Sequence, residues 1–162
     1  MLFADLCGST DLASRLDPED YCDLVGRVLD AIDAEIEAHG GTVDKHLGDG
    51  AMALFGAPVA HDDDPLRAVH AAAAIHRRVA ALAQDATMVL AVHIGIAVGD
   101  VVAGGVGRTG HAGYTVVGES VNVAARLLEL AGPGETLLSQ DVHERMQGRV
   151  ALTEAGSVTP AA

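Results

Sequence analysis

The sequence predicts an α+β domain in which helices pack on an antiparallel-rich sheet. Three observations favour this class. Hydrophobic residues make up 49% of the 162 positions, enough for one buried core. Strand-like and helix-like segments follow one another in an order that mixes hairpins with helical crossovers. No segment repeats, and no apolar run approaches the roughly 20 residues that a membrane span needs.

The first half of the chain is predicted to hold a strand, two helices and a hairpin. Asp17 and Pro18 are typical of a helix start, and apolar residues then recur at every fourth position up to the glycines at 40–41. The Gly-Asp-Gly turn at 48–50 indicates a hairpin. The predicted elements are a strand at 1–6, a short helix at 10–16, the helix from 17 to 40, and strands at 42–47 and 51–55.

The second half continues the alternation of helices and strands, with glycine and proline between them. The predicted elements are a helix at 65–84, strands at 89–98, 101–106 and 114–117, a helix at 118–130, a strand at 136–138 and a helix at 139–147. We expect residues 1–147 to form one domain and 148–162 to form an irregular tail or incomplete terminal strands. The abrupt start and the patternless end indicate a domain that is trimmed at both ends.

The strongly acidic composition argues against some classes of binding partner. Ten basic residues stand against 23 acidic ones, a net charge of −13, so nucleic acid and anionic membranes are not expected as partners. A polyphosphate substrate would need metal ions to supply positive charge. Cys7 and Cys22 are too few for a disulfide framework and fit reduced thiols. Because no secretory signal precedes the first strand, we expect a cytoplasmic protein.

Two aspartates are candidate metal ligands. Asp5 lies within the apolar first strand, where a carboxylate is unfavourable unless something compensates it. Asp49 lies at the tip of the predicted hairpin, and the two carboxylates converge if that hairpin pairs beside the first strand. Hard oxygen ligands of this kind suit Mg²⁺. The structural alternative is that Asp49 belongs to an ordinary turn and that Asp5 caps a helix.

Two further groups of residues could contact a nucleotide. Gly8, Ser9 and Thr10 precede a helix, where backbone N–H groups can bind a phosphate. Asn122 and Arg126 stand four residues apart and therefore share one helix face. An amide can orient a ribose, and a guanidinium can stabilise charge on a phosphoryl group. The alternative is a capping asparagine and a solvated arginine.

Four motifs occur in register over residues 1 to about 140. They are Phe-x-Asp-Leu-x-Gly-Ser-Thr at 3–10, Lys-His-Leu-Gly-Asp-Gly at 45–50, His-Ile-Gly-Ile at 93–96 and Tyr-Thr-Val-Val-Gly-x-x-Val-Asn-x-Ala-x-Arg at 114–126. Together they resemble the catalytic domain of the class III adenylyl and guanylyl cyclases. The resemblance implies a ferredoxin-like palm and a homodimer with active sites at the interface.

The same resemblance assigns roles by position. It makes Asp5 and Asp49 the ligands of two Mg²⁺ or Mn²⁺ ions. It makes Asn122 the residue that positions the ribose and Arg126 the residue that stabilises the transition state. In the family's symmetric dimer, one subunit supplies the aspartates of a site and the other supplies the remaining polar residues, so a lone monomer would be inactive.

Lys45 and Thr115 fall at the two positions that select the base. A lysine only donates hydrogen bonds, which suits N1 of adenine, and the hydroxyl of a threonine can accept from the N6 amine. Guanine presents donors at N1 and N2 and would want an acidic residue at position 45, so ATP is favoured over GTP. Thr115 departs from the aspartate that is commonest in the family. It is typical of a branch, called IIIb, that includes bicarbonate-responsive cyclases.

The leading hypothesis is therefore an adenylate cyclase that converts ATP to 3′,5′-cyclic AMP and pyrophosphate. One alternative is a catalytically silent cyclase-like module that binds nucleotide or dimerises. The other is a guanylate cyclase. Further regulatory domains in a longer parent protein are compatible with each hypothesis. The acidic loop at 61–64 is interpreted as a helix start and not as a metal site.

Overall fold

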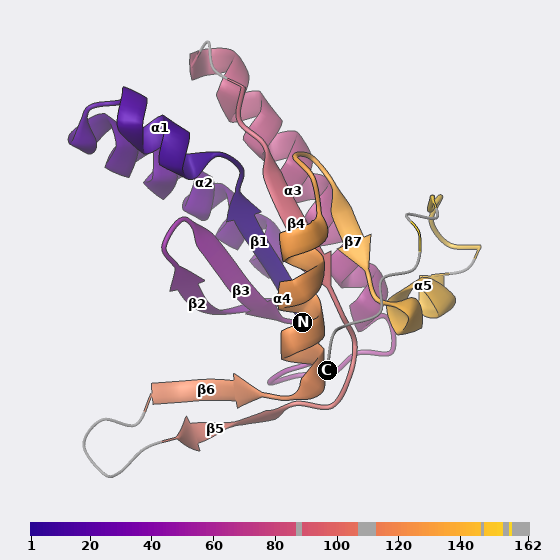
Figure 1. Cartoon of the computed structure of the whole chain (residues 1–162). Coiled ribbons are helices and arrows are strands. Elements are labelled where there is room, and N and C mark those ends of the chain that lie inside the picture. The colour runs from indigo at the N-terminus through magenta and orange to yellow at the C-terminus, as the bar shows by residue number, and fades with distance from the viewer. Residues whose placement is uncertain (87–88, 107–112, 147, 154–155, 157–162) are drawn as a thin grey trace.

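In the computed structural model, the chain forms a five-stranded sheet with helices on both faces and a separate two-stranded ribbon (Figure 1). The structure describes residues 1–86, 89–106, 113–146, 148–153 and 156. Its elements are β1 (Leu2–Leu6), α1 (Ser9–Arg15), α2 (Pro18–Ala38), β2 (Thr42–Leu47), β3 (Gly50–Leu54), α3 (Asp64–Ala86), β4 (Val92–Ile96), β5 (Val102–Val106), β6 (Gly113–Val117), α4 (Glu119–Leu130), β7 (Thr136–Leu138) and α5 (Gln140–Met146).

The sheet has the strand order β2-β3-β1-β4-β7. The first strand lies at its centre, antiparallel to both β3 and β4, while β7 runs parallel to β4 on the far side. β2 and β3 form the antiparallel hairpin that the Gly-Asp-Gly turn predicts. The predicted α+β class, with an antiparallel-rich sheet, is confirmed.

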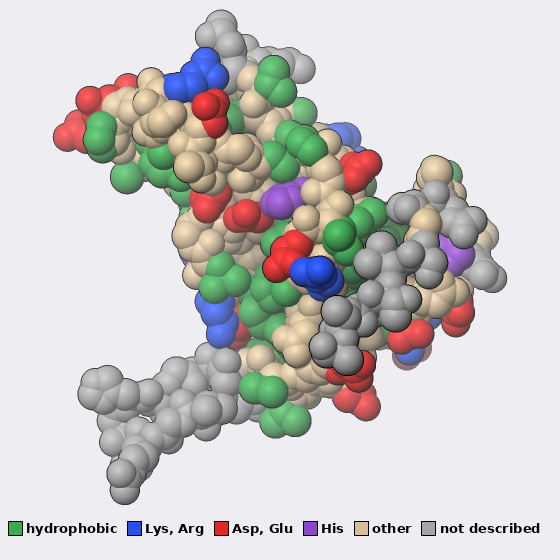
Figure 2. All heavy atoms as spheres, viewed as in Figure 1, with side chains coloured by type: hydrophobic (Ala, Val, Ile, Leu, Met, Phe, Trp, Pro, Cys, Tyr) green, Lys and Arg blue, Asp and Glu red, His purple; other side chains and the backbone are tan. Residues whose placement is uncertain are grey.

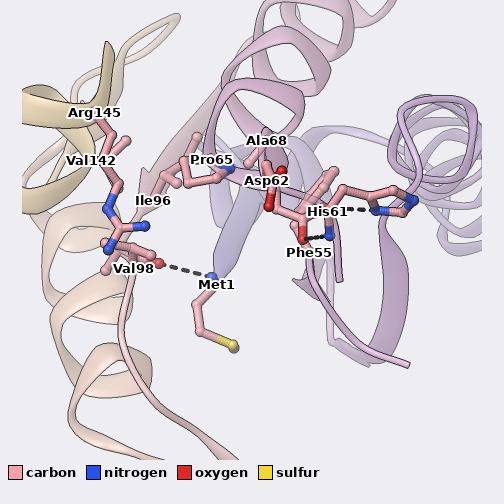
Figure 3. A pocket seen from close by; sticks show the side chains of 12 residues that line it. Met1, Phe55, His61, Asp62, Pro65, Ala68, Ile96, Val98, Val142 and Arg145 are labelled. Carbon is pink, nitrogen blue, oxygen red and sulfur yellow. Dashed lines mark hydrogen bonds and ion pairs between the residues drawn. The ribbon is translucent and has the colours of Figure 1, made fainter. Parts of the chain in front are cut away.

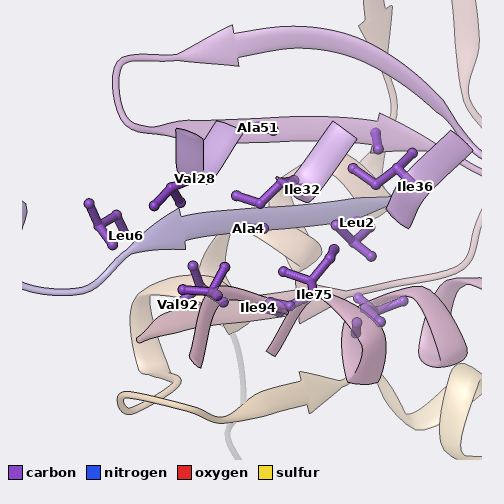
Figure 4. Close-up of a cluster of buried hydrophobic side chains, with 14 of the residues drawn as sticks. Leu2, Ala4, Leu6, Val28, Ile32, Ile36, Ala51, Ile75, Val92 and Ile94 are labelled. Atoms are coloured by element: carbon purple, nitrogen blue, oxygen red, sulfur yellow. The ribbon is translucent and has the colours of Figure 1, made fainter. Parts of the chain in front are cut away.

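Alternate residues of β1 face two separate cores. Leu2, Ala4 and Leu6 pack against α2 and α3 on one face (Figure 4), whereas Phe3 packs on the opposite face with Ala124 of α4. A strand sends successive side chains to opposite faces, so a helix layer on each side leaves no place for an apolar residue to face water. β1 is thereby fixed in register by both of its faces.

The apolar stripe of α2 is the one predicted from the sequence. Val28, Ile32 and Ile36 are fully buried against β1 and β3. Asp17 is the N-cap, and its carboxylate accepts a hydrogen bond of 3.1 Å from the N–H of Glu19. Both ends of this helix therefore follow from local sequence signals.

The first of the two middle strands of the second half is shorter than predicted, and the second, present as predicted, lies outside the main sheet. β4 is shorter than the predicted 89–98, and β5 does not join the main sheet but pairs with β6 in a ribbon that projects from it (Figure 1). Both edges of β4 are already occupied, one by β1 and the other by β7. β5 therefore has no free edge of β4 to pair with, although it follows β4 in the chain.

The last segment has no helix or strand in residues 148–153, although Val150 and Leu152 pack against the main core. The rest of the predicted tail lies largely outside the described residues, as does residue 147 at the predicted domain limit. In the described part of the chain, none of the helices is long and apolar enough to cross a membrane.

Candidate active site

Asp5 and Asp49 meet at one end of the central sheet. Asp5 on β1 pairs in register with Gly50 on β3, and Asp49 directly precedes that glycine in the turn. A Cβ at position 50 would run into the Asp5 carboxylate and the carbonyl of Ala4, so only glycine lets Asp5 lie over β3. Gly48, with a φ of 71°, makes the turn itself. The two glycines therefore serve both the turn and the approach of the carboxylates.

The electrostatics of this pair fit a bound cation. The Asp49 Oδ2 atom is buried and has no hydrogen-bond partner among the described residues. Burial raises the pKa of Asp5, and the neighbouring Asp49 carboxylate raises it further. A buried, unpaired carboxylate oxygen beside a second carboxylate is unfavourable unless positive charge arrives.

The donor set suits Mg²⁺ or Mn²⁺, because both prefer oxygen ligands and Mg²⁺ commonly combines one or two carboxylates with water and substrate phosphates. Within the described residues, no three His, Cys, Asp or Glu side chains converge as a complete metal site. The two aspartates therefore suit a metal ion whose remaining ligands are water and the phosphate oxygens of a nucleotide.

His93 is a site residue to which the sequence prediction assigned no role. It lies on β4 in register with Asp5, and its Nε2 atom is 3.5 Å from Asp5 Oδ2. Its Nδ1 atom lies 3.0 Å from the carbonyl oxygen of Ala131, which holds the ring in place. The available signal was a polar residue between Val92 and Ile94 in a buried strand. Only the strand register shows that this position faces Asp5.

The acidic residues of the candidate site reach the molecular surface. Figure 2 shows acidic side chains beside a histidine in the middle of one face, over β1 and α4. A second group of acidic side chains covers the outer end of α1 and α2, in keeping with the net charge of −13.

Gly8, Ser9 and Thr10 directly follow β1, next to Asp5 in the chain. Gly8 has a φ of 69° and is the N-cap of α1, with no side-chain hydrogen bond at the cap. Gly8 and Thr10 are exposed, and Ser9 is half-buried. The first N–H groups of α1 are thus close along the chain to the aspartate end of the sheet, as the sequence predicts.

Asn122 and Arg126 are both exposed on α4. The Arg126 guanidinium forms an ion pair of 2.7 Å with Glu129, and both side chains are more than half exposed. The helix itself is pressed onto β4, since a Cβ on Gly95 would collide with the carbonyl of Ala124. α4 is therefore firmly placed, while the two polar side chains predicted to act on substrate face solvent.

Lys45 and Thr115 lie on different sheets. Lys45 is on β2, the edge strand, and its ammonium is 3.1 Å from the carboxylate of Asp44. Thr115 is on β6, paired with Gly104 of β5. In the part of the chain that the structure describes, Lys45, Asn122 and Arg126 make no hydrogen bond or ion pair with Asp5 or Asp49. Strand register thus brings the two aspartates together within one copy of the chain, whereas Lys45, Asn122 and Arg126 make no described polar contact with them.

A cavity of about 360 Å³ lies at the opposite end of β1 from Asp5 (Figure 3). Its lining includes Met1, Phe55 and Arg145, and it contains none of the predicted site residues. Asp64 in its wall is buried and accepts a hydrogen bond of 2.7 Å from the N–H of His61. The acidic loop at 61–64 therefore forms the start of α3, as predicted.

Comparison with known proteins gives the same fold from independent directions. The family model for the "Adenylate and Guanylate cyclase catalytic domain" matches residues 1–159. The adenylyl cyclase CyaB from P. aeruginosa is 28% identical, with a TM-score of 0.93 over 98% of this chain and 84% of that one. The guanylyl cyclase Cya2 is 32% identical, with a TM-score of 0.90 over 98% of this chain and 83% of that one.

Among curated proteins, the uncharacterized protein Rv1319c of Mycobacterium tuberculosis is 41% identical over 143 residues, which are 87% of this chain and 26% of that protein. The chain thus spans about a quarter of the length of the curated relatives that it matches. Because the family match runs through every strand and helix from β1 to α5, the chain belongs to the family of adenylate and guanylate cyclase catalytic domains.

Proposed function

We propose that this chain is the catalytic domain of an adenylate cyclase, which converts ATP to 3′,5′-cyclic AMP and pyrophosphate in a homodimer. The observation that carries the proposal is the Asp5–Asp49 pair, in which the buried Asp49 Oδ2 atom has no hydrogen-bond partner among the described residues. A chain with a net charge of −13 binds a polyphosphate only if cations offset the repulsion. The pair supplies a place for those cations beside the N-terminal turn of α1.

Asp5 and Asp49 would hold two Mg²⁺ or Mn²⁺ ions. When bound, such ions neutralise phosphate charge and make a hydroxyl a better nucleophile. The protein's own contribution is to keep both carboxylates in place against their mutual repulsion. Gly50 does so by letting Asp5 lie over β3, and His93 by contacting Asp5 from β4. Backbone N–H groups at Gly8, Ser9 and Thr10 would bind phosphate oxygens.

Arg126 and Asn122 would act on the substrate of the partner's aspartate pair. Asn122 would hold the ribose so that its 3′-hydroxyl attacks the α-phosphorus, and Arg126 would stabilise charge that develops as pyrophosphate leaves. Both side chains are exposed on α4, which lets them reach a second subunit. Val102 and Val117, paired on the ribbon, are 75% and 58% exposed. Apolar side chains presented in this way suit a protein interface.

ATP is the proposed substrate because Lys45 can only donate a hydrogen bond to the base. Thr115 would accept from the N6 amine of adenine. The similar structures include both adenylyl and guanylyl cyclases, so the fold does not decide the base and the proposal depends on these two positions. The cytoplasmic location and a response to bicarbonate remain predictions from the sequence.

The test is a turnover assay on purified protein with Mn²⁺ or Mg²⁺ and ATP, with cyclic AMP measured by chromatography. We expect cyclic AMP, a specific activity that rises with protein concentration, and a slower reaction with GTP. Faster formation of cyclic GMP would instead identify a guanylate cyclase. ATP binding without product from either nucleotide would identify a silent regulatory module.

A further inference from the structure

Asp44, next to Lys45, has a buried carboxylate. Its side chain is only 2% exposed, and its Oδ2 atom has no aligned hydrogen bond among the described residues. The nearest charge is the Lys45 ammonium, 3.1 Å from that oxygen, and the Lys45 side chain is 34% exposed. The two groups therefore form an ion pair in which the carboxylate is inside the protein and the ammonium reaches the surface.

An irregularity in the β2–β3 pairing makes this contact possible. Val43 pairs with Ala53 and Lys45 pairs with Met52, so Asp44 is the extra residue of a bulge. In a regular strand, neighbouring side chains point to opposite faces and cannot meet. A bulge redirects one of them, and here it brings the Asp44 carboxylate to the ammonium of the following residue.

This pair is a poor device for stability. Removing a carboxylate from water is unfavourable, and its attraction to one partly exposed ammonium offsets only part of that desolvation free energy. Lys45 is the only lysine in the sequence, whose other basic residues are arginines. The buried Asp44 carboxylate thus pairs with Lys45, the side chain that is proposed to contact the base.

We propose that Asp44 is a positioning residue that sets base selectivity by holding the Lys45 ammonium. This inference rests on the proposed function, since it concerns the base that Lys45 reads. A free lysine side chain samples many rotamers, whereas the attraction of a fixed carboxylate 3.1 Å away keeps the ammonium near one position. The Lys45 ammonium can donate to adenine N1, but it cannot accept a hydrogen bond from guanine N1–H.

The first experiment compares ATP with 1-deaza-ATP, in which a C–H group replaces the N1 acceptor. We expect the wild-type protein to prefer ATP by about tenfold or more in kcat/KM, the range for losing a hydrogen bond to a charged group. Asp44→Asn is expected to reduce that preference to about a third or less. The loss should appear mainly in KM, with kcat for 1-deaza-ATP nearly unchanged.

The matched control is Asp33→Asn. It removes one negative charge from the same region, where both Asp33 oxygens lie 3.0 Å from His46 Nε2, but it does not touch Lys45. We expect it to keep the wild-type preference for ATP. If the amide does not fit the buried position, Asp44→Ser is a smaller uncharged replacement for the same comparison.

A second readout does not depend on turnover. Because the chain has one lysine, lysine labelled with ¹⁵N at Nζ gives one ammonium signal by NMR. We expect Asp44→Asn to shift and broaden that signal and Asp33→Asn to leave it in place. An unmoved signal in Asp44→Asn, or a preference for ATP equal to the wild type, would overturn the inference. Failure of the proposed function would look different, namely no cyclic nucleotide from the wild-type protein.

Discussion

The candidate site residues at the aspartate end of the central sheet lie together within one chain, whereas those on the outer surfaces of α4 and β2 make no described polar contact with them. At the sheet end, Asp5, Asp49 and His93 are brought together by strand register, and a missing Cβ at Gly50 makes room for them. On α4, Asn122 and Arg126 face solvent, and the only charged partner of Arg126 among the described residues is exposed Glu129.

The difference follows from what each group has to do. Two carboxylates repel each other, so they need a buried and rigid scaffold to stay close before a cation arrives. A side chain that acts on a substrate held by another subunit must be accessible. The exposed Arg126–Glu129 pair contributes only about 0–1 kcal/mol, so a bound polyphosphate can displace Glu129 readily. The two aspartates are thus held within one chain, whereas Asn122 and Arg126 are accessible to a partner copy, as the proposed two-half site requires.

Combining inactive variants gives the largest expected effect. Asp49→Asn removes a proposed metal ligand, and Arg126→Ala removes the arginine proposed to stabilise the transition state, so each homodimer should lose at least about 100-fold in kcat. Mixing the two should restore about a quarter of wild-type activity, because about half of the dimers are then mixed and each of these has one intact site of two. Cyclic AMP formation by the mixture measures this. A mixture that stays inactive, although mixed dimers form, contradicts the two-half site.

The change in Tm on adding Mn²⁺ distinguishes the proposed metal ligands from the residues on α4 without measuring turnover. Mn²⁺ binds the folded protein and should raise the Tm of the wild type by a few degrees when it is well above its Kd. Arg126→Ala should keep this shift, and Asp49→Asn should lose it. The measurement is a thermal melt with and without Mn²⁺. An equal shift in all three proteins would place the metal elsewhere.

Because α4 packs closely on β4 at Gly95, we expect Gly95→Ala to cause a moderate loss of stability. The new Cβ would meet the carbonyl of Ala124, so α4 must move, at about 1–3 kcal/mol. Gly26→Ala in α2 is the control, because a Cβ there meets nothing within 4 Å. It should stabilise the helix by about 0.5–1 kcal/mol. Urea unfolding measures both changes, and the idea is wrong if they have the same sign.

The smallest effect concerns the pH dependence of stability without metal. The pKa of Asp5 is raised in the folded state above its ordinary value of 3.8, so the folded protein binds this proton more tightly than the unfolded chain. Stability from this group is present below pH 3.8 and declines as pH rises to the raised pKa. Asp5→Asn should therefore gain stability relative to the wild type over that window. Urea unfolding in EDTA across this pH range measures the difference, and a constant difference would contradict the raised pKa.

Much of the fold could be predicted because its signals are local. The capped α2, the Gly-Asp-Gly hairpin and the start of α3 each follow from a few adjacent residues, and the structure confirms them. The position of β5 could not be predicted in this way. It depends on β7 occupying the edge of β4, and β7 begins at Thr136, far along the chain from the end of β5 at Val106.

The sequence by itself determined the family and the two aspartates, since the motifs around them are contiguous and carry their own chemistry. Three features were decided only by tertiary structure. The partnership of His93 with Asp5 depends on strand register, and the burial of Asp44 against Lys45 depends on a bulge. The Asp49 Oδ2 atom is buried by the fold, and none of the described residues donates a hydrogen bond to it. Local sequence specifies which groups a chain carries, but burial and pairing depend on segments that meet only after folding.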